Sequence, residues 1–215
     1  MGFILPCQSR AYWERGGMTM ENAIYTEKYK GCNISIYPDN DCESPEEYGD
    51  ESLFLCGFHD QFSVTPYNIK SPEDIDDYKK THHIFALTAY IHGGVALSLD
   101  SGSYPFNDRW DSCQVGVVFV EKKWKRLRKS AEKSASGLVD TWNDYLSGNV
   151  YGYIAEESDD SCWGFYGDYN SSGILEEARS NIDFHVDKKR KSAIEKLKVY
   201  IKNHVPFENR ELIRI

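Results

Sequence analysis

The chain has 215 residues, of which 40% are hydrophobic and 27% charged, and a net charge of −9. This length and balance are typical of one globular domain and exclude a largely disordered chain. No apolar run approaches the roughly 20 residues that cross a bilayer, and no basic signal-peptide region opens the chain, which favours a soluble cytoplasmic protein without membrane contact.

The N-terminal segment has an alternative origin. Residues 14–17, just before Met18, read Glu-Arg-Gly-Gly, which a purine-rich ribosome-binding site encodes when it is read in frame. Translation therefore starts at Met1 or, by this hypothesis, at Met18 or Met20. We expect residues 1–20 to be a disordered, non-native extension, 21–205 to be a single domain and 206–215 a C-terminal tail.

The first half of the chain predicts strands joined as hairpins. Lys30-Gly31 and Gly93-Gly94 are turn signals between strand-like runs. A Ser71 cap followed by Pro72 predicts one short helix between them. In chain order, the predicted elements are strands at 23–29, 32–37 and 53–59, a helix ending near Lys80, and strands at 83–91, 95–99 and 114–120.

The second half predicts helices around a further hairpin. The predicted helices cover 121–133, 138–146, 174–182 and 188–203, and the predicted hairpin strands cover 150–156 and 162–166. Gly137 separates the first two helices, Gly148 stops the second, and Pro206 ends the last. In 188–203 the residues Ala193, Ile194, Leu197, Tyr200 and Ile201 recur at helical spacing, which predicts a face packed on a sheet. We predict an α+β fold with one mainly antiparallel sheet of about six or seven strands, built from hairpins and covered by about three to five helices.

Charge is unevenly distributed along the sequence. Residues 21–120 carry 17 acidic and 6 basic side chains, whereas 121–215 carry 16 acidic and 17 basic ones. Seven carboxylates lie within 39–51. Such a stretch is either a solvated loop or an acidic face that binds a basic partner or mimics phosphates, and it disfavours simple duplex binding. The candidate partner-binding residues are Glu43, Glu46, Glu47, Asp50 and Glu51.

A basic run has the opposite character. Six of the eight residues at 122–129 are Lys or Arg, and 188–191 is a second run. The simplest interpretation is the wet face of an amphipathic helix, with Trp124 and Leu127 turned toward the protein. The alternative is a nucleic-acid contact in which Trp124 stacks on a base. Its candidate residues are Lys122, Lys125, Arg126 and Lys129.

No catalytic signature is present in the sequence. Six cysteines lack Cys-x-x-Cys spacing, which indicates free thiols. If the chain is an enzyme, the trio Cys162, His92 and Asp111 supplies a nucleophile, a base and a group that orients the base. A metal site from His59, His92, Asp108 and Asp111 is less favoured because no two share an element at ligand spacing, so neither a metal nor a cofactor is expected.

Several strings resemble a family of uncharacterised accessory proteins carried by phages and plasmids, mostly of Gram-positive bacteria. The matching pieces are 43–45, the strand ending at His59, 90–94, Trp-Asp-Ser-Cys-Gln-Val-Gly at 110–116, 145–153, and Asp-Ser-Cys-Trp-Gly-Phe-Tyr-Gly at 160–167. Gly stands in the family where this chain has Cys113, which counts against Cys113 as a nucleophile, whereas Cys162 matches. The resemblance implies cargo of mobile DNA and carries no established activity.

Three functions remain open. The first is a non-enzymatic anti-defence protein, of anti-restriction or anti-CRISPR type, that binds a host defence protein or nucleoprotein through its acidic face. The second is a hydrolase or nuclease, acting on nucleic acid or a nucleotide signal, that uses Cys162, His92 and Asp111. The third is a structural or regulatory phage protein. An enzyme needs the trio to converge in a cleft, whereas a binder needs an exposed acidic or aromatic face.

Overall fold

The structure is a computed structural model that describes residues 22–46, 51–65, 69, 72–100, 111–158 and 160–210. The strands are β1 (Tyr25–Tyr29), β2 (Cys32–Pro38), β3 (Leu53–His59), β4 (Phe62–Val64), β5 (His82–Ile91), β6 (Val95–Leu99), β7 (Ser112–Glu121), β8 (Val150–Ala155) and β9 (Asp160–Tyr166), and the helices are α1 (Ile75–Tyr78), α2 (Arg128–Ser147), α3 (Ile174–His204) and α4 (Phe207–Arg210). The expected extension at 1–20 lies outside the described residues.

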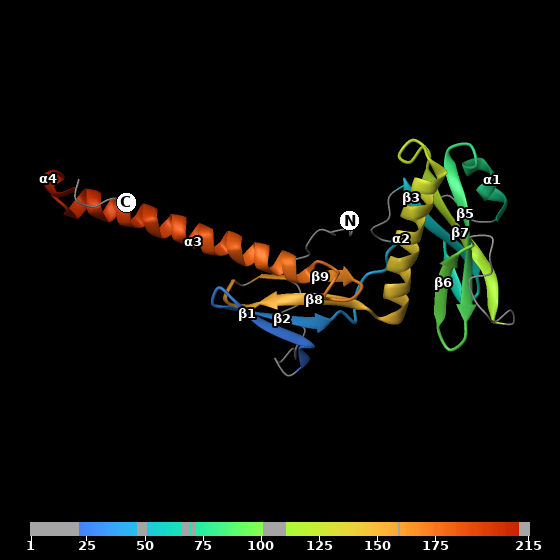
Figure 1. Cartoon of the computed structure of the whole chain (residues 1–215), viewed down its shortest axis with the longest axis horizontal. Helices are drawn as coiled ribbons and strands as arrows, with labels where there is room; N and C mark the ends of the chain where they lie inside the picture. The colour runs from blue at the N-terminus through green and yellow to red at the C-terminus, as the bar shows by residue number, and fades with distance from the viewer. Residues whose placement is uncertain are drawn as a thin grey trace.

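The antiparallel α+β fold is confirmed, but its strands form two sheets instead of one (Figure 1). The four-stranded sheet has the order β1-β2-β8-β9, and the five-stranded sheet has the order β4-β3-β7-β5-β6. Both predicted Gly turns make hairpins. At the first turn Lys30 and Gly31 have φ angles of 49° and 90°, the left-handed backbone that a two-residue hairpin needs. The sequence analysis did not foresee β4.

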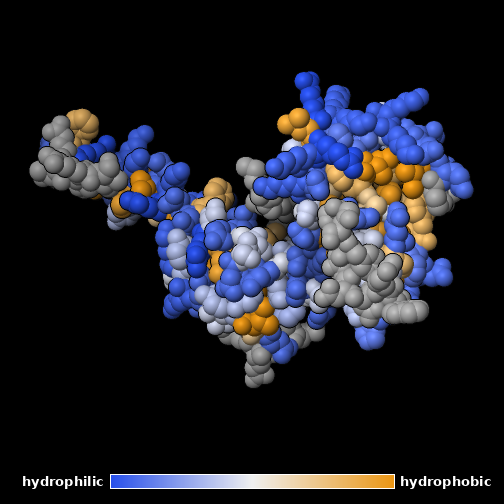
Figure 2. All heavy atoms as spheres, turned by 45° about the vertical axis from the view of Figure 1, so that its right-hand side comes forward, coloured by the Kyte–Doolittle hydropathy of each residue, from blue (hydrophilic) through white to orange (hydrophobic). Residues whose placement is uncertain are grey.

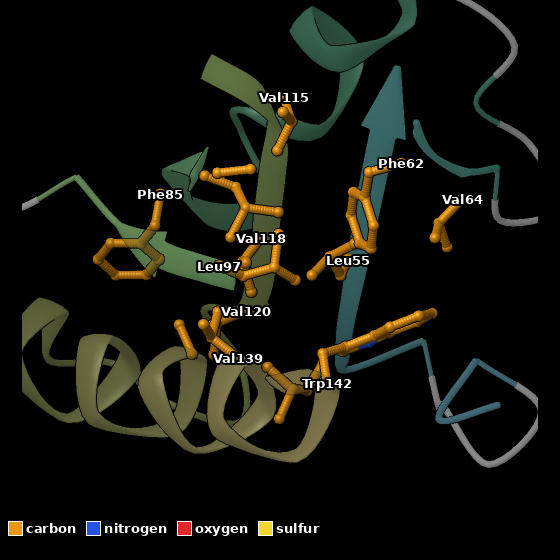
Figure 3. Packing of buried hydrophobic residues seen from close by; sticks show 14 of the residues in the cluster. Leu55, Phe62, Val64, Phe85, Leu97, Val115, Val118, Val120, Val139 and Trp142 are labelled. Carbon is orange, nitrogen blue, oxygen red and sulfur yellow. The ribbon is translucent and has the colours of Figure 1, made fainter. Parts of the chain in front are cut away.

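Helix α2 covers one face of the five-stranded sheet. Its buried residues Ala131, Ala135, Val139 and Trp142 recur at helical spacing and pack against the strands (Figure 3). The indole of Trp142 meets the Phe62 ring edge-on, with 5.5 Å between ring centroids. This apolar stripe explains why the helix forms where it does.

The predicted break of this helix at Ser136-Gly137 is wrong. A glycine inside a helix costs about 1 kcal/mol, which the packing of the stripe on both sides of Gly137 outweighs. The predicted stop is confirmed, because Gly148 ends the helix in the left-handed conformation with φ of 74°. Asn143 further ties the helix to the sheet edge: it accepts the Leu97 N–H (2.7 Å) and donates to the Leu97 carbonyl (2.9 Å).

The opposite face of the five-stranded sheet has a smaller apolar cluster. Cys56, Ile69, Val117 and Phe119 are buried there. Helix α1 contributes Tyr78, whose ring centroid lies 5.2 Å from that of Phe119. Consecutive side chains of β3 and β7 point to opposite faces of this sheet, and both sets are buried. Both faces of the sheet are therefore covered.

The four-stranded sheet packs against the first two turns of α3. Ile174, Ala178 and Ile182 are fully buried against a cluster that includes Tyr153. Arg179 strengthens the contact by a bidentate ion pair with Glu27 of β1, with both N···O distances at 2.8 Å. These contacts fix the start of the helix on the sheet.

Beyond Ile182 the helix leaves the sheet and projects away from the rest of the protein (Figure 1). The predicted packing of Ala193, Ile194, Leu197, Tyr200 and Ile201 on a sheet is therefore wrong, and Leu197 is 47% exposed. The two helices predicted at 174–182 and 188–203 are one, because neither Gly nor Pro interrupts the sequence between Gly173 and Pro206. Figure 2 shows hydrophilic surface interrupted by hydrophobic patches along this projection.

The chain crosses between the two sheets twice. Residues 39–52 lead from β2 to β3, and 148–149 lead from α2 back to β8. The two crossings meet where the Asp39 N–H donates to the Val150 carbonyl (2.8 Å), next to the pairing of Pro38 with Tyr151. The five-stranded sheet and α2 are thus inserted in the sequence between two paired strands.

Two alanine substitutions in the same helix test this arrangement. Replacing the fully buried Ile182 by Ala should lower the free energy of unfolding by about 2–5 kcal/mol, because it leaves a cavity under α3. Replacing the exposed Leu197 by Ala should change it by no more than about 0.5 kcal/mol. Urea unfolding of both variants measures the difference. Equal losses would show that the projecting part of α3 packs on the protein.

Candidate functional site

His92 and Asp111 come together at one end of the five-stranded sheet. His92 follows β5 and Asp111 precedes β7, and the pairing of Tyr90 with Ser112 brings the two ends side by side. His92 Nδ1 lies 2.9 Å from Asp111 Oδ2, and the imidazole is exposed. A carboxylate on one ring nitrogen orients the imidazole, so this pair matches two of the predicted catalytic roles.

The predicted nucleophile is not part of this pair. Cys162 lies on β9 of the four-stranded sheet, is 4% exposed and packs in the cluster under α3. His92 and Asp111 belong to the five-stranded sheet, so the sequence-based trio is not assembled around Cys162. His92 and Asp111 meet because β5 and β7 are neighbours in one sheet, a pairing that the sequence analysis did not predict. The sheet to which Cys162 belongs could not be deduced from spacing.

The weaker metal hypothesis has no support in the described residues. Within the described part of the chain, no three His, Cys, Asp or Glu side chains are grouped to hold a metal ion. His59 ends β3, and its Nδ1 accepts the Gln61 N–H at 3.2 Å. Asp108 lies outside the described residues. The described surface also has an open hollow lined by Asp74, Asp77, Tyr78 and Thr81, which contains none of the predicted site residues.

The acidic segment, residues 39–51, is anchored on the four-stranded sheet through its described part, 39–46. Tyr166 donates its hydroxyl hydrogen to the Glu43 carbonyl at 2.7 Å, and Pro45 is buried. Asp39 is only 7% exposed, and its Oδ2 accepts the N–H of Gly164 at 3.2 Å. Burial raises the pKa of the Asp39 carboxyl, and the nearby carboxylate of Asp41 adds to this effect.

Of the five predicted partner-binding residues, Glu46 and Glu51 are exposed and Glu43 is half-buried, whereas Glu47 and Asp50 lie outside the described residues. Asp41 adds an exposed carboxylate that the prediction did not include. The segment is therefore attached to the sheet at its base while several carboxylates remain in solvent.

Close packing in the sheet beneath the segment explains why glycine occupies positions 152 and 164. A Cβ on Gly152 would lie 2.1 Å from the Trp163 ring, so only glycine fits opposite that indole. Gly164 has φ of 81°, which directs its N–H at Asp39 without backbone strain. Beside these glycines the β8–β9 register shifts between Tyr151 and Tyr153. Asp39 was not predicted as the anchor, because an aspartate in an acidic run resembles its solvated neighbours.

The basic run is a turn followed by a helix, not a helix throughout. Residues 122–127 connect β7 to α2, which begins only at Arg128. The predicted inward orientation of Trp124 and Leu127 is wrong, since they are 44% and 73% exposed. Lys122 and Lys125, predicted to be wet, are half-buried, whereas Arg126 and Lys129 are exposed as predicted. Figure 2 shows strongly hydrophilic side chains at this end of the molecule.

None of the protein-family models, curated proteins or solved structures compared with this chain matches it. Across the described residues, no helix combines the length and apolar character needed to cross a bilayer. The residues and their geometry are therefore the basis for the functional argument.

The buried carboxyl predicts a pH dependence. A raised pKa in the folded state means that Asp39 contributes stability at low pH, which is lost as the pH rises through the folded pKa. Asp39→Asn keeps an acceptor for the Gly164 N–H and does not ionise. We expect this variant to resist urea better than the parent near neutral pH, with the difference shrinking toward about pH 4. A constant difference at every pH would contradict this assignment.

Proposed function

We propose that this protein is a non-enzymatic accessory protein of a mobile genetic element. It acts in the cytoplasm of the host cell, where it binds a host defence protein or nucleoprotein through the acidic segment and thereby disables it. The resemblance of its motifs to phage and plasmid accessory proteins supports the genomic setting. The concentration of negative charge in residues 21–120 supports the mode of binding.

One observation carries this proposal: the described part of the acidic segment, residues 39–46, is anchored on the four-stranded sheet. The Asp39–Gly164 and Tyr166–Glu43 hydrogen bonds fix its backbone on the four-stranded sheet. Glu46 remains exposed beside this anchor, and Glu51 is exposed where the segment reaches β3. A surface that is already ordered loses less conformational entropy when it binds, which favours affinity.

The charge of the segment indicates the chemistry of the partner. Seven carboxylates within thirteen residues repel an anionic surface and attract a cationic one. Proteins that act on nucleic acids have basic surfaces that neutralise phosphates. The acidic segment is suited to such a surface, where carboxylates replace phosphates and block access to the natural ligand.

The catalytic alternative requires a nucleophile near the His92–Asp111 pair. Cys162 does not meet this requirement, because it lies in the core of the other sheet. A hydrolase or nuclease with this trio would have to rearrange both sheets to bring the thiol to the imidazole. The arrangement of the described residues therefore does not support a catalytic mechanism that uses Cys162.

An in-cell protection assay tests the proposal. Replacing Glu43, Glu46, Glu47, Asp50 and Glu51 by Gln or Asn should abolish protection against the host defence system, because association driven by charge is lost. The matched control removes five exposed carboxylates elsewhere: Asp60→Asn, Glu73→Gln, Asp77→Asn, Glu132→Gln and Asp140→Asn. The control should still protect, and so should Cys162→Ser if it folds.

Two results would contradict the proposal. The acidic-segment variant could protect as well as the parent, which would exclude the segment as the contact. Alternatively, a folded Cys162→Ser variant could be inactive while the acidic-segment variant protects, which would favour the enzyme. Urea unfolding of each variant establishes whether it is folded, since exposed substitutions change stability by no more than about 0.5 kcal/mol each.

A further inference from the structure

A second charged surface lies at the N-terminal end of α2 and has the opposite sign. Seven of the twelve residues at 122–133 are Lys or Arg, and one is acidic. We propose that the basic turn, residues 122–129, binds single-stranded nucleic acid. Lys123, Arg126 and Lys129 contact phosphates, and Trp124 stacks on a base. This inference is independent of the acidic segment and goes beyond the proposed function.

The turn is held in place from both sides. The Lys122 ammonium donates to the Lys79 carbonyl at 2.7 Å. The backbone N–H of Lys122 donates to the Thr81 carbonyl at 2.9 Å. The His83 imidazole lies 3.0 Å from the Lys125 carbonyl. These contacts use the half-buried residues of the turn to fix its backbone. The exposed cations at 123, 126 and 129 are therefore displayed on an ordered surface.

Trp124 gives the patch a base-stacking element. Its side chain is 44% exposed although large aromatic rings are usually buried, and the Lys125 ammonium lies 4.4 Å from its ring centroid. An exposed aromatic ring among cations is the combination that binds single strands, since the ring stacks on a base of any sequence. No carboxylate among the described residues lies within salt-bridge distance of Lys123, Arg126 or Lys129.

Two features of this turn are unfavourable for the start of α2. Leu127 occupies the N-cap position without a capping hydrogen bond, and it is 73% exposed. Arg128 and Lys129 add positive charge to the end of the helix where the backbone dipole is already positive. Bound phosphates would offset this repulsion.

Fluorescence anisotropy with a labelled oligothymidylate at low salt tests the proposal. We expect the parent to bind and its affinity to fall with salt at a log–log slope of about −2, as about three phosphate contacts to a single strand require. Trp124→Ala should weaken binding about tenfold, and Trp124→Phe should restore most of the loss, because the ring is what stacks.

Leu127→Asp is the sharpest variant because it separates folding from binding. The new carboxylate caps α2 and should raise the thermal midpoint by a few degrees, while its charge lowers the affinity for the oligonucleotide. Replacing the exposed cations Lys123, Arg126 and Lys129 by Gln should lower the affinity. The matched charge control is Lys196→Gln, Lys198→Gln and Lys202→Gln on the projecting part of α3, which should bind like the parent.

Four outcomes would overturn the proposal. They are no binding at low salt, an equal loss of affinity in the α3 control, equal binding of Trp124→Ala and the parent, and tighter binding to vesicles of anionic lipid than to the oligonucleotide. The second would indicate diffuse attraction to all cations of the protein. The last would indicate a membrane surface.

Discussion

The pairing of β2 with β8 holds the architecture together. Pro38 and Tyr151 are opposite each other in the ladder although the entire five-stranded sheet and α2 lie between them in the sequence. Closing so long an excursion costs more loop entropy than closing the short hairpins around it. The same junction places Asp39 beside Val150, so the pairing that closes the four-stranded sheet also fixes the first residue of the acidic segment. A change that loosened this junction would disturb both sheets and the proposed contact surface together.

Helix α2 separates the basic turn from the β2–β8 junction. Its 20 residues correspond to a length of about 30 Å, with the basic turn before its first residue and the junction after its last. The acidic segment begins at this junction with Asp39 and ends with Glu51 next to the basic turn, because the Ser52 carbonyl accepts the Glu121 N–H at 2.8 Å. The first turn of α2 contains no acidic residue and the last turn no basic residue, which is the reverse of what the helix dipole favours. The charges in the first and last turns of α2 therefore do not stabilise the helix through its dipole, and their effect is on the charge of the protein surface.

Local signals predicted the hairpins well and the long-range packing poorly. Lys30-Gly31 and Gly93-Gly94 specify tight turns through residues adjacent in sequence, so no distant information was needed. The stripe of Leu197 and Tyr200 shows which helical residues share a face, but it does not reveal that the sheet ends before them. Trp124 was expected to face the protein because its i, i+3 spacing with Leu127 suits one face of a helix, but residues 122–127 form a turn before α2. The meeting of His92 with Asp111 depended on two strand ends of one sheet, whereas Cys162 required knowing that there were two sheets.

The length of α3 has a thermodynamic consequence for the helix–coil balance of its second half. Isolated helices are marginal in water because the first turn fixes several residues for a single hydrogen bond. Ile174, Ala178 and Ile182 supply that nucleus through tertiary packing, and the projecting residues then add one hydrogen bond each as the helix propagates. Lys188 and Lys191, three residues apart on one helix face, repel each other and weaken propagation there. Protection of backbone amides from solvent exchange should therefore decline from Ile182 toward His204 as a gradient, because the helix frays inward from its free end.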